Sequence, residues 1–136
     1  AEGMRFLEQR SRDSRFDKQI DKELLKLANH GNIIMDSWTM PWLVKRGLKI
    51  WLEAFPEKSA VRIARRDHLS VGEALRALKS KETSTKSIYE RLYGFRLGQD
   101  FGPFQFVLDT DNLEARQVFQ VLCLVIDNCL FQLRNC

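Results

Sequence analysis

The chain has 136 residues, of which 44% are hydrophobic and 29% are charged, and its net charge is +4. This balance predicts one globular domain and excludes a disordered chain. No apolar run reaches the ~18 residues of a membrane span, because Gln120, Asp127 and Asn128 interrupt the longest one, so we expect no membrane contact.

The three cysteines, Cys123, Cys129 and Cys136, cluster near the C-terminus with no histidine beside them. A zinc site needs closer pairs and further ligands, so we expect no metal site. Free thiols are typical of a reducing compartment. We therefore expect an intracellular protein of the cytoplasm or of an organellar matrix.

In chain order, apolar residues at helical spacing predict a helix over 16–29. A short apolar run then predicts a strand over 32–36. A second strand is predicted over 48–54, which is rich in residues that fill buried sheets.

A helix is predicted to start after Pro56, because proline is favoured in the first turn. The next helix opens with the capping box Ser70–Glu73. A third strand is predicted over 104–110, followed by a long helix capped by Asn112. Strands that alternate with helices predict the α/β class, with a mostly parallel sheet and flanking helices.

Three segments together resemble cytidylate kinases, above all the archaeal type, within the nucleoside monophosphate kinase family. They read "FDKQIDKELLKLANHGNIIMDSW", "LKIWLEAFPEKSAVRIARRDHLSVGEALRALKSKETSTKSIYERLYGF" and "FQFVLDTDNLEARQVFQVL". The resemblance covers residues 4–130 in collinear order. It implies a single truncated domain over 1–136 with a P-loop-type parallel sheet, and a lid over about 62–96.

Phosphoryl transfer needs a glycine-rich cradle of the form G-x-x-x-x-G-K-[ST], and the 136 residues contain no such motif. In the family this loop follows the first strand. We therefore expect that strand to be absent from this chain, and its slot in the sheet to be filled by a protein partner or a second copy. ATP and Mg²⁺ would be cofactors only if a P-loop segment is supplied.

Two further sets of family positions have changed. Asp36, Ser37 and Trp38 stand where the family carries an arginine that holds the monophosphate. The lid pattern R-E-x-S-E-x-x-R-Y reads "KETSTKSIY", so that lysine, threonine and isoleucine replace Arg, Glu and Arg at positions 81, 85 and 88. Lysine lacks the planar fork of arginine. The charged positions are lost, whereas the strand and core positions are kept.

The resemblance nevertheless implies candidate site residues. The candidates for lid or phosphate contact are Arg62, Arg66 and Lys81. The candidates for the nucleotide pocket are Asp36, Trp38, Tyr89 and Asp100. No residue is assigned a catalytic role.

The expected function is that of a degenerate cytidylate-kinase-like domain, inactive alone, that serves as a binding or structural component of a larger assembly. The alternative is a (d)CMP kinase that uses ATP and has its P-loop in an upstream segment. The lid is also basic, so RNA or nucleotide phosphate is a further expected partner, although a solvated helical face explains the same residues. These basic residues are Arg62, Arg65, Arg66, Arg76, Lys79, Lys81, Lys86 and Arg91.

Overall fold

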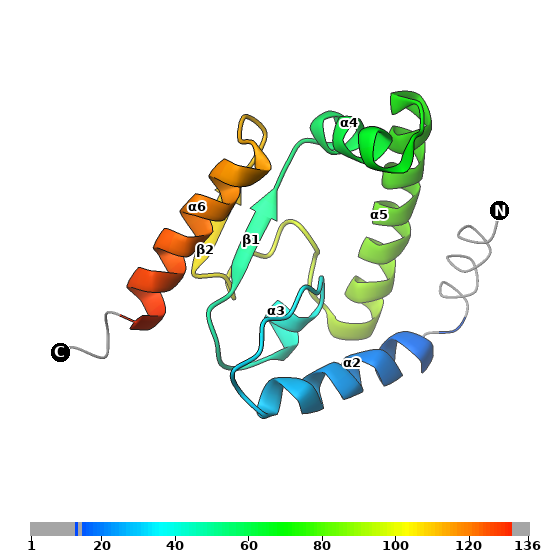
Figure 1. Cartoon of the computed structure of the whole chain (residues 1–136). Coiled ribbons are helices and arrows are strands. Elements are labelled where there is room, and N and C mark those ends of the chain that lie inside the picture. The colour runs from blue at the N-terminus through cyan, green and yellow to red at the C-terminus, as the bar shows by residue number, and fades with distance from the viewer. Residues whose placement is uncertain (1–12, 14, 132–136) are drawn as a thin grey trace.

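The computed structural model describes residues 13 and 15–131. Two helices precede each of the two strands, and a further helix follows the second strand (Figure 1). In order they are α2 (Arg15–Asn29), α3 (Met40–Leu43), β1 (Ile50–Glu53), α4 (Pro56–Asp67), α5 (Val71–Tyr93), β2 (Phe106–Asp109), α6 (Ala115–Ile126) and the π-helical turn η1 (Asp127–Phe131).

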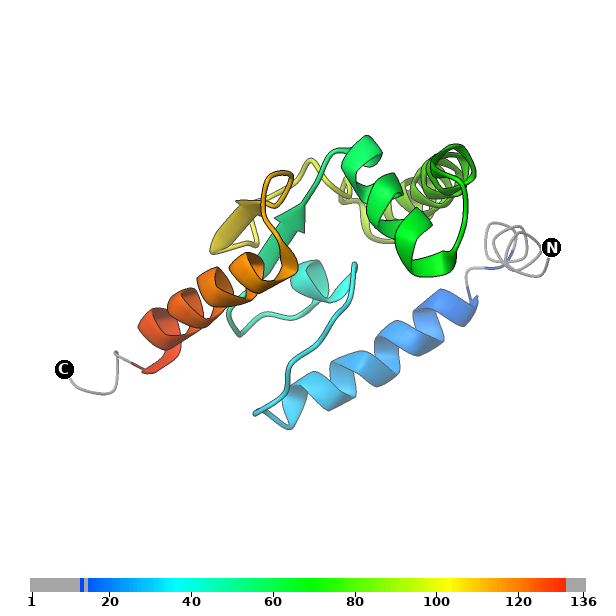
Figure 2. The same cartoon turned by 45° about the horizontal axis from the view of Figure 1, so that its top comes forward.

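The two strands pair in parallel, in the register Ile50 with Phe106 through Glu53 with Asp109. Both lie inside the predicted strand ranges, and the α/β class is confirmed. Parallel neighbours require a crossover connection, which the α4–α5 hairpin supplies. Figure 2 shows the strands lying between this hairpin and α6.

The strand predicted over 32–36 is wrong, because residues 33–37 have no regular secondary structure. Within the described part of the chain no strand pairs with this segment. A β-strand is stabilised by backbone hydrogen bonds to a neighbouring strand, so an apolar sequence alone does not form a strand. Ile34 is consequently 96% exposed.

The α4–α5 hairpin is packed through small side chains. Ala60 and Ala74 are fully buried and Ala64 nearly so, which allows the two helices to approach closely. The Ser70–Glu73 capping box is confirmed: the Glu73 amide donates to Ser70 Oγ at 3.3 Å, and the Ser70 amide donates to Glu73 Oε2 at 3.0 Å. These hydrogen bonds fix the start of the long helix α5.

The main core lies where the C-terminal end of α5 meets α3 and β1. Trp42 stacks on Phe95 with ring centroids 4.2 Å apart, and its Nε1 donates to the Asp100 carbonyl at 3.1 Å. Trp51 contacts the edge of this cluster, 6.0 Å from Trp42. Aromatic pairs in such geometries add to simple area burial. Both tryptophans therefore pack against the core.

Helix α2 is anchored by a carboxylate rather than by its apolar stripe. Asp21 is 6% exposed and accepts from Thr39 Oγ1 at 2.8 Å and from the Tyr93 hydroxyl at 2.5 Å. Phe16 and Leu27, by contrast, are each 48% exposed. Charge-assisted hydrogen bonds of this kind are the strong ones, so they fix α2 against α3 and α5.

The C-terminal helix begins later than predicted. Its N-cap is Glu114, whose side chain and that of Gln117 form a reciprocal capping box, so the predicted Asn112 cap is wrong. Cys123 and Cys129 are free thiols, while Cys136 lies outside the described residues. Among the described residues no helix is long and apolar enough to cross a membrane, and no group of three potential ligands could hold a metal ion.

Candidate functional site

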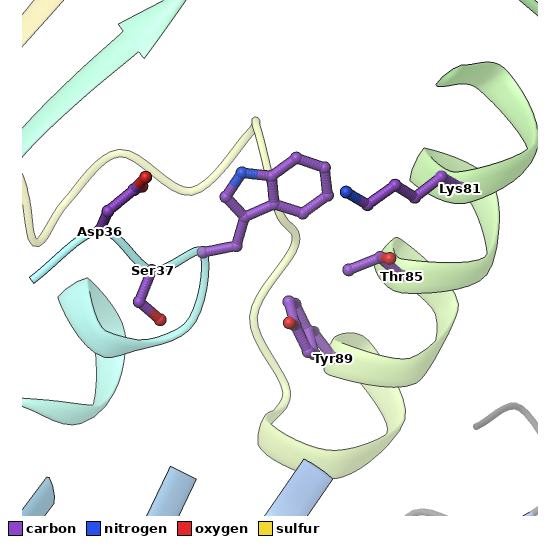
Figure 3. A pocket seen from close by; sticks show the side chains of 6 residues that line it. Asp36, Ser37, Lys81, Thr85 and Tyr89 are labelled. Atoms are coloured by element: carbon purple, nitrogen blue, oxygen red, sulfur yellow. The ribbon is translucent and has the colours of Figure 1, made fainter. Parts of the chain in front are cut away.

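A pocket of about 310 Å³ lies between the loop that precedes α3 and the middle of α5. Its volume is at the lower end of the range for small-molecule sites, roughly 300–1,000 Å³. Figure 3 shows Asp36 and Ser37 on the loop side, and Lys81, Thr85 and Tyr89 on α5. Trp38 completes the lining.

The loop side of the pocket is held in place by Ser37. Its Oγ accepts from the amides of Thr39 and Met40, each at 3.3 Å, at the start of α3. Pro41 follows in the first turn, a position that proline favours. The Ser37 hydroxyl is thus used structurally, and the exposed Asp36 carboxylate remains available on the rim.

The helix side contributes the only cation among the described lining residues. Lys81 Nζ lies 5.1 Å from the centroid of the Trp38 ring, within the range of a cation–π interaction. This contact joins α5 to the loop. It also places the ammonium group beside an aromatic face rather than at the centre of a set of anion-binding groups.

Thr85 is the least satisfied polar group of the pocket. Its side chain is 1% exposed, and its Oγ1 has no hydrogen-bond partner among the described residues. A buried hydroxyl without a partner loses its hydration, which costs about 1–3 kcal/mol. This oxygen has almost no accessible surface, so a ligand in the pocket does not reach it and the cost stays in the folded protein.

The next residues along α5 turn into the core. Ile88 is 2% exposed and packs with Tyr89, Phe95 and Leu97. The family resemblance expects an arginine at this position. The isoleucine found here packs in the core and does not line the pocket, so this position supplies no second cation.

The structure brings four of the predicted site residues together: Asp36, Trp38, Lys81 and Tyr89. It separates the other three. The Arg62 guanidinium donates to the Thr110 carbonyl and, at 3.0 Å, to Thr110 Oγ1, which ties α4 to the end of β2.

Arg66 and Asp100 are likewise engaged elsewhere. Arg66 pairs with Asp67 at 2.6 Å on the surface, and this contact holds the pKa of Asp67 below its usual value. Asp100 accepts from the Arg96 amide at 2.5 Å and closes the turn before β2. None of these three residues lines the pocket.

Sequence reasoning missed two features. Thr85 attracted notice only as a replacement for glutamate, because its burial and its unpaired hydroxyl have no signal in one sequence. The Asp21–Thr39–Tyr93 network joins residues up to 72 positions apart, so no local pattern predicts it. Asp17 and Asp21 lie four residues apart on one face of α2, and both are buried. Their spacing was the hint of a buried polar network that the sequence offered.

The described residues do not fit a nucleoside triphosphate. Phosphates are held by backbone N–H cradles and by planar arginine forks. Here Arg62 binds Thr110 and Arg66 binds Asp67, and the described lining of the pocket contains one lysine and one carboxylate.

The parallel strand pair, its helical crossover and the pocket between loop and helix are compatible with a nucleoside-monophosphate-kinase-like fold. No protein-family model and no solved structure matches the chain. Curated protein sequences, by contrast, do match the chain. The chain is similar to the cytidylate kinase of Methanocaldococcus jannaschii, with 31% identity over 117 residues that cover 82% of this chain and 65% of the relative.

Similar matches come from cytidylate kinases of two other organisms. The Methanococcus maripaludis protein is 30% identical over 82% of this chain and 65% of its own length, and that of Pyrococcus horikoshii is 29% identical over 82% and 58%. The chain is thus cytidylate-kinase-like, and the resemblance read from its sequence is confirmed. It spans less than two thirds of the length of these relatives.

Proposed function

We propose that this chain is a cytidylate-kinase-like binding domain. The pocket between Asp36 and Tyr89 binds a cytosine-containing ligand, and the 136 residues do not transfer a phosphoryl group by themselves. The domain serves as a binding component of a larger assembly. The relatives are named cytidylate kinases, which is the reason to propose a cytosine-containing ligand. The composition of the pocket is the reason to expect no phosphoryl transfer.

The observation that carries this proposal is the set of side chains around the pocket. Phosphoryl transfer relies on positive groups that neutralise charge on the moving phosphoryl, and one such arginine contributes roughly 10³–10⁵ in rate. Among the described lining residues the pocket offers Lys81 alone as a cation, and its ammonium group lies over the Trp38 ring. The position of the second lid arginine holds Ile88, which lies in the core.

The pocket is nevertheless suited to a planar polar ligand. Trp38 and Tyr89 are aromatic lining residues, and Asp36 and Lys81 supply one hydrogen-bond acceptor group and one donor group. Sites of this kind combine an apolar lining with a few placed polar groups. Loss of charge therefore does not imply loss of binding.

Two assays on the purified chain test the proposal. Calorimetric titration with cytosine nucleosides and nucleotides should detect binding, and Trp38→Ala should abolish it. A coupled assay with ATP, Mg²⁺ and CMP should give no ADP above a blank without protein. CMP-dependent ADP formation would overturn the proposal in favour of a kinase, and a folded chain that binds no cytosine ligand would overturn the binding role.

A further inference from the structure

We propose that α6 is an interface through which two copies of this chain associate, with the two α6 helices antiparallel about a two-fold axis. This association is independent of the proposed ligand, because α6 contributes no residue to the described lining of the pocket. Three features of the helix support it: its exposure, the spacing of its apolar residues and the order of its charges.

The first feature is that the chain leaves an apolar helix uncovered. Every residue of α6 is apolar except Arg116, Gln117 and Gln120, yet none of its residues is buried, and Phe119 is 66% exposed. Figures 1 and 2 both show α6 at one side of the molecule, with its outer flank clear of the other described elements. A helix of such composition is normally buried, so α6 is suited to contact with a further chain.

The second feature is an apolar stripe along this helix. Phe119, Cys123, Ile126 and, in η1, Leu130 follow one another at intervals of four, three and four residues, the spacing that places side chains on one face. The ends of the stripe are exposed, whereas Cys123 and Ile126 are half-buried. A stripe of this kind forms the seam of a helix pair, and Phe119 is its largest side chain.

The third feature is the order of the charges beside the stripe. Arg116 lies in the first turn of α6 and Asp127 directly after its last residue, and they share one side of the helix because about three turns separate them. Both side chains are exposed, and neither has an ion-pair partner among the described residues. In an isolated helix both charges are unfavourably placed, since the N-terminal end carries partial positive charge and the C-terminal end partial negative charge.

An antiparallel second copy turns this order into an attraction. Each Arg116 then lies beside Asp127 and the C-terminal end of the other α6, so the interface contains two ion pairs related by the two-fold axis. In the same register, Phe119 lies level with the segment between Cys123 and Ile126 of the second copy. A parallel arrangement would pair neither charge with its opposite. The charge order therefore selects a second copy as the partner and sets its direction.

Sedimentation velocity of the purified chain, with a reductant and over the micromolar range, tests the association. We expect a reversible dimer, and Phe119→Asp should raise its dissociation constant by more than roughly tenfold. Leu124→Asp is the matched control, because Leu124 is 65% exposed on the same helix but lies about 140° around its axis from Phe119. The control should leave the dimer intact. The melting temperatures of the two variants show whether both remain folded.

A charge exchange tests the direction of the helices. Arg116→Glu alone should weaken the dimer roughly tenfold, because each ion pair becomes a repulsion. An acidic residue in the first turn favours the helix itself, so unfolding would not explain this loss. The double variant Arg116→Glu, Asp127→Arg should recover the native affinity, since both ion pairs form again with their signs exchanged.

Each outcome supports or overturns the proposal. A native chain that stays monomeric would overturn it. A dimer that Phe119→Asp and Leu124→Asp weaken equally, or that neither weakens, would have its contact elsewhere and would overturn it as well. If the double variant does not recover the affinity lost in Arg116→Glu, the antiparallel arrangement is wrong. None of these results changes the test of cytosine binding, so the two proposals fail separately.

Discussion

Removing the hydroxyl of Thr85 should make the protein more stable. The Thr85 side chain is 1% exposed and its Oγ1 has no partner among the described residues, so the folded state carries an uncompensated desolvation cost. Such costs are about 1–3 kcal/mol. Valine has nearly the same shape and nearly the same helix propensity, so Thr85→Val removes the cost with little else changed.

We expect Thr85→Val to raise the free energy of unfolding by about 1 kcal/mol, the low end of that range. For a domain of this size the melting temperature should rise by about 4 °C. Urea unfolding followed by tryptophan fluorescence measures the first quantity, and calorimetry measures the second.

The control is Thr83→Val, two residues away on α5. There the hydroxyl is satisfied by the Lys79 carbonyl and the side chain is exposed, so the change should stay within about 0.5 kcal/mol. A loss of stability in Thr85→Val, or a change equal to that of Thr83→Val, would refute the reasoning. It would mean that the Thr85 hydroxyl has a partner, such as a bound water.

Three further predictions concern the anchors of the fold. Asp21→Ala leaves the hydroxyls of Thr39 and Tyr93 without their acceptor, so the free energy of unfolding should fall by about 2–4 kcal/mol in urea titrations; a loss below 0.5 kcal/mol would contradict the network. Burial and the hydrogen bond to Asp21 raise the pKa of Tyr93, so its contribution to stability is complete below the usual tyrosine pKa of about 10 and is lost as the pH rises further. The fall in stability above pH 10 should therefore be shallower in Tyr93→Phe, and equal slopes would count against this assignment. Gly94 ends α5 with φ +75° and has open space around the site of a Cβ, so Gly94→Ala should cost about 1–2 kcal/mol from backbone strain alone, while unchanged stability would show that the helix end relaxes.

Local signals in the sequence were sufficient for most of the fold. The strand at Ile50–Glu53 and the capping box at Ser70 depend on residues close together, and both are confirmed. The strand predicted over 32–36 depended on a partner, which the described residues do not supply, and it is wrong. Whether a partner or a second copy completes the two-stranded sheet stays a prediction, and the mass of the chain in solution tests it.

The candidate site was predicted in part. The resemblance gave Lys81 as a candidate for lid or phosphate contact, and Asp36, Trp38 and Tyr89 as candidates for the nucleotide pocket. All four line one pocket in the structure. Arg62, a candidate for phosphate contact, lies outside this pocket and donates to Thr110, a contact that depends on the whole fold and has no local signal in the sequence. Burial of single polar atoms, as at Thr85, depends on packing that no local pattern records.

The central claim is that the pocket at Trp38 binds a cytosine-containing ligand, and the indole N–H signals of the three tryptophans test it directly. Trp42 Nε1 is bonded to the Asp100 carbonyl and Trp51 Nε1 is buried, so both should be insensitive to a ligand in the pocket. In an NMR titration of the nitrogen-labelled chain with cytidine, the Trp38 signal, assigned through Trp38→Phe, should shift with saturation while the other two stay in place. Three unmoved signals at millimolar cytidine would contradict the account.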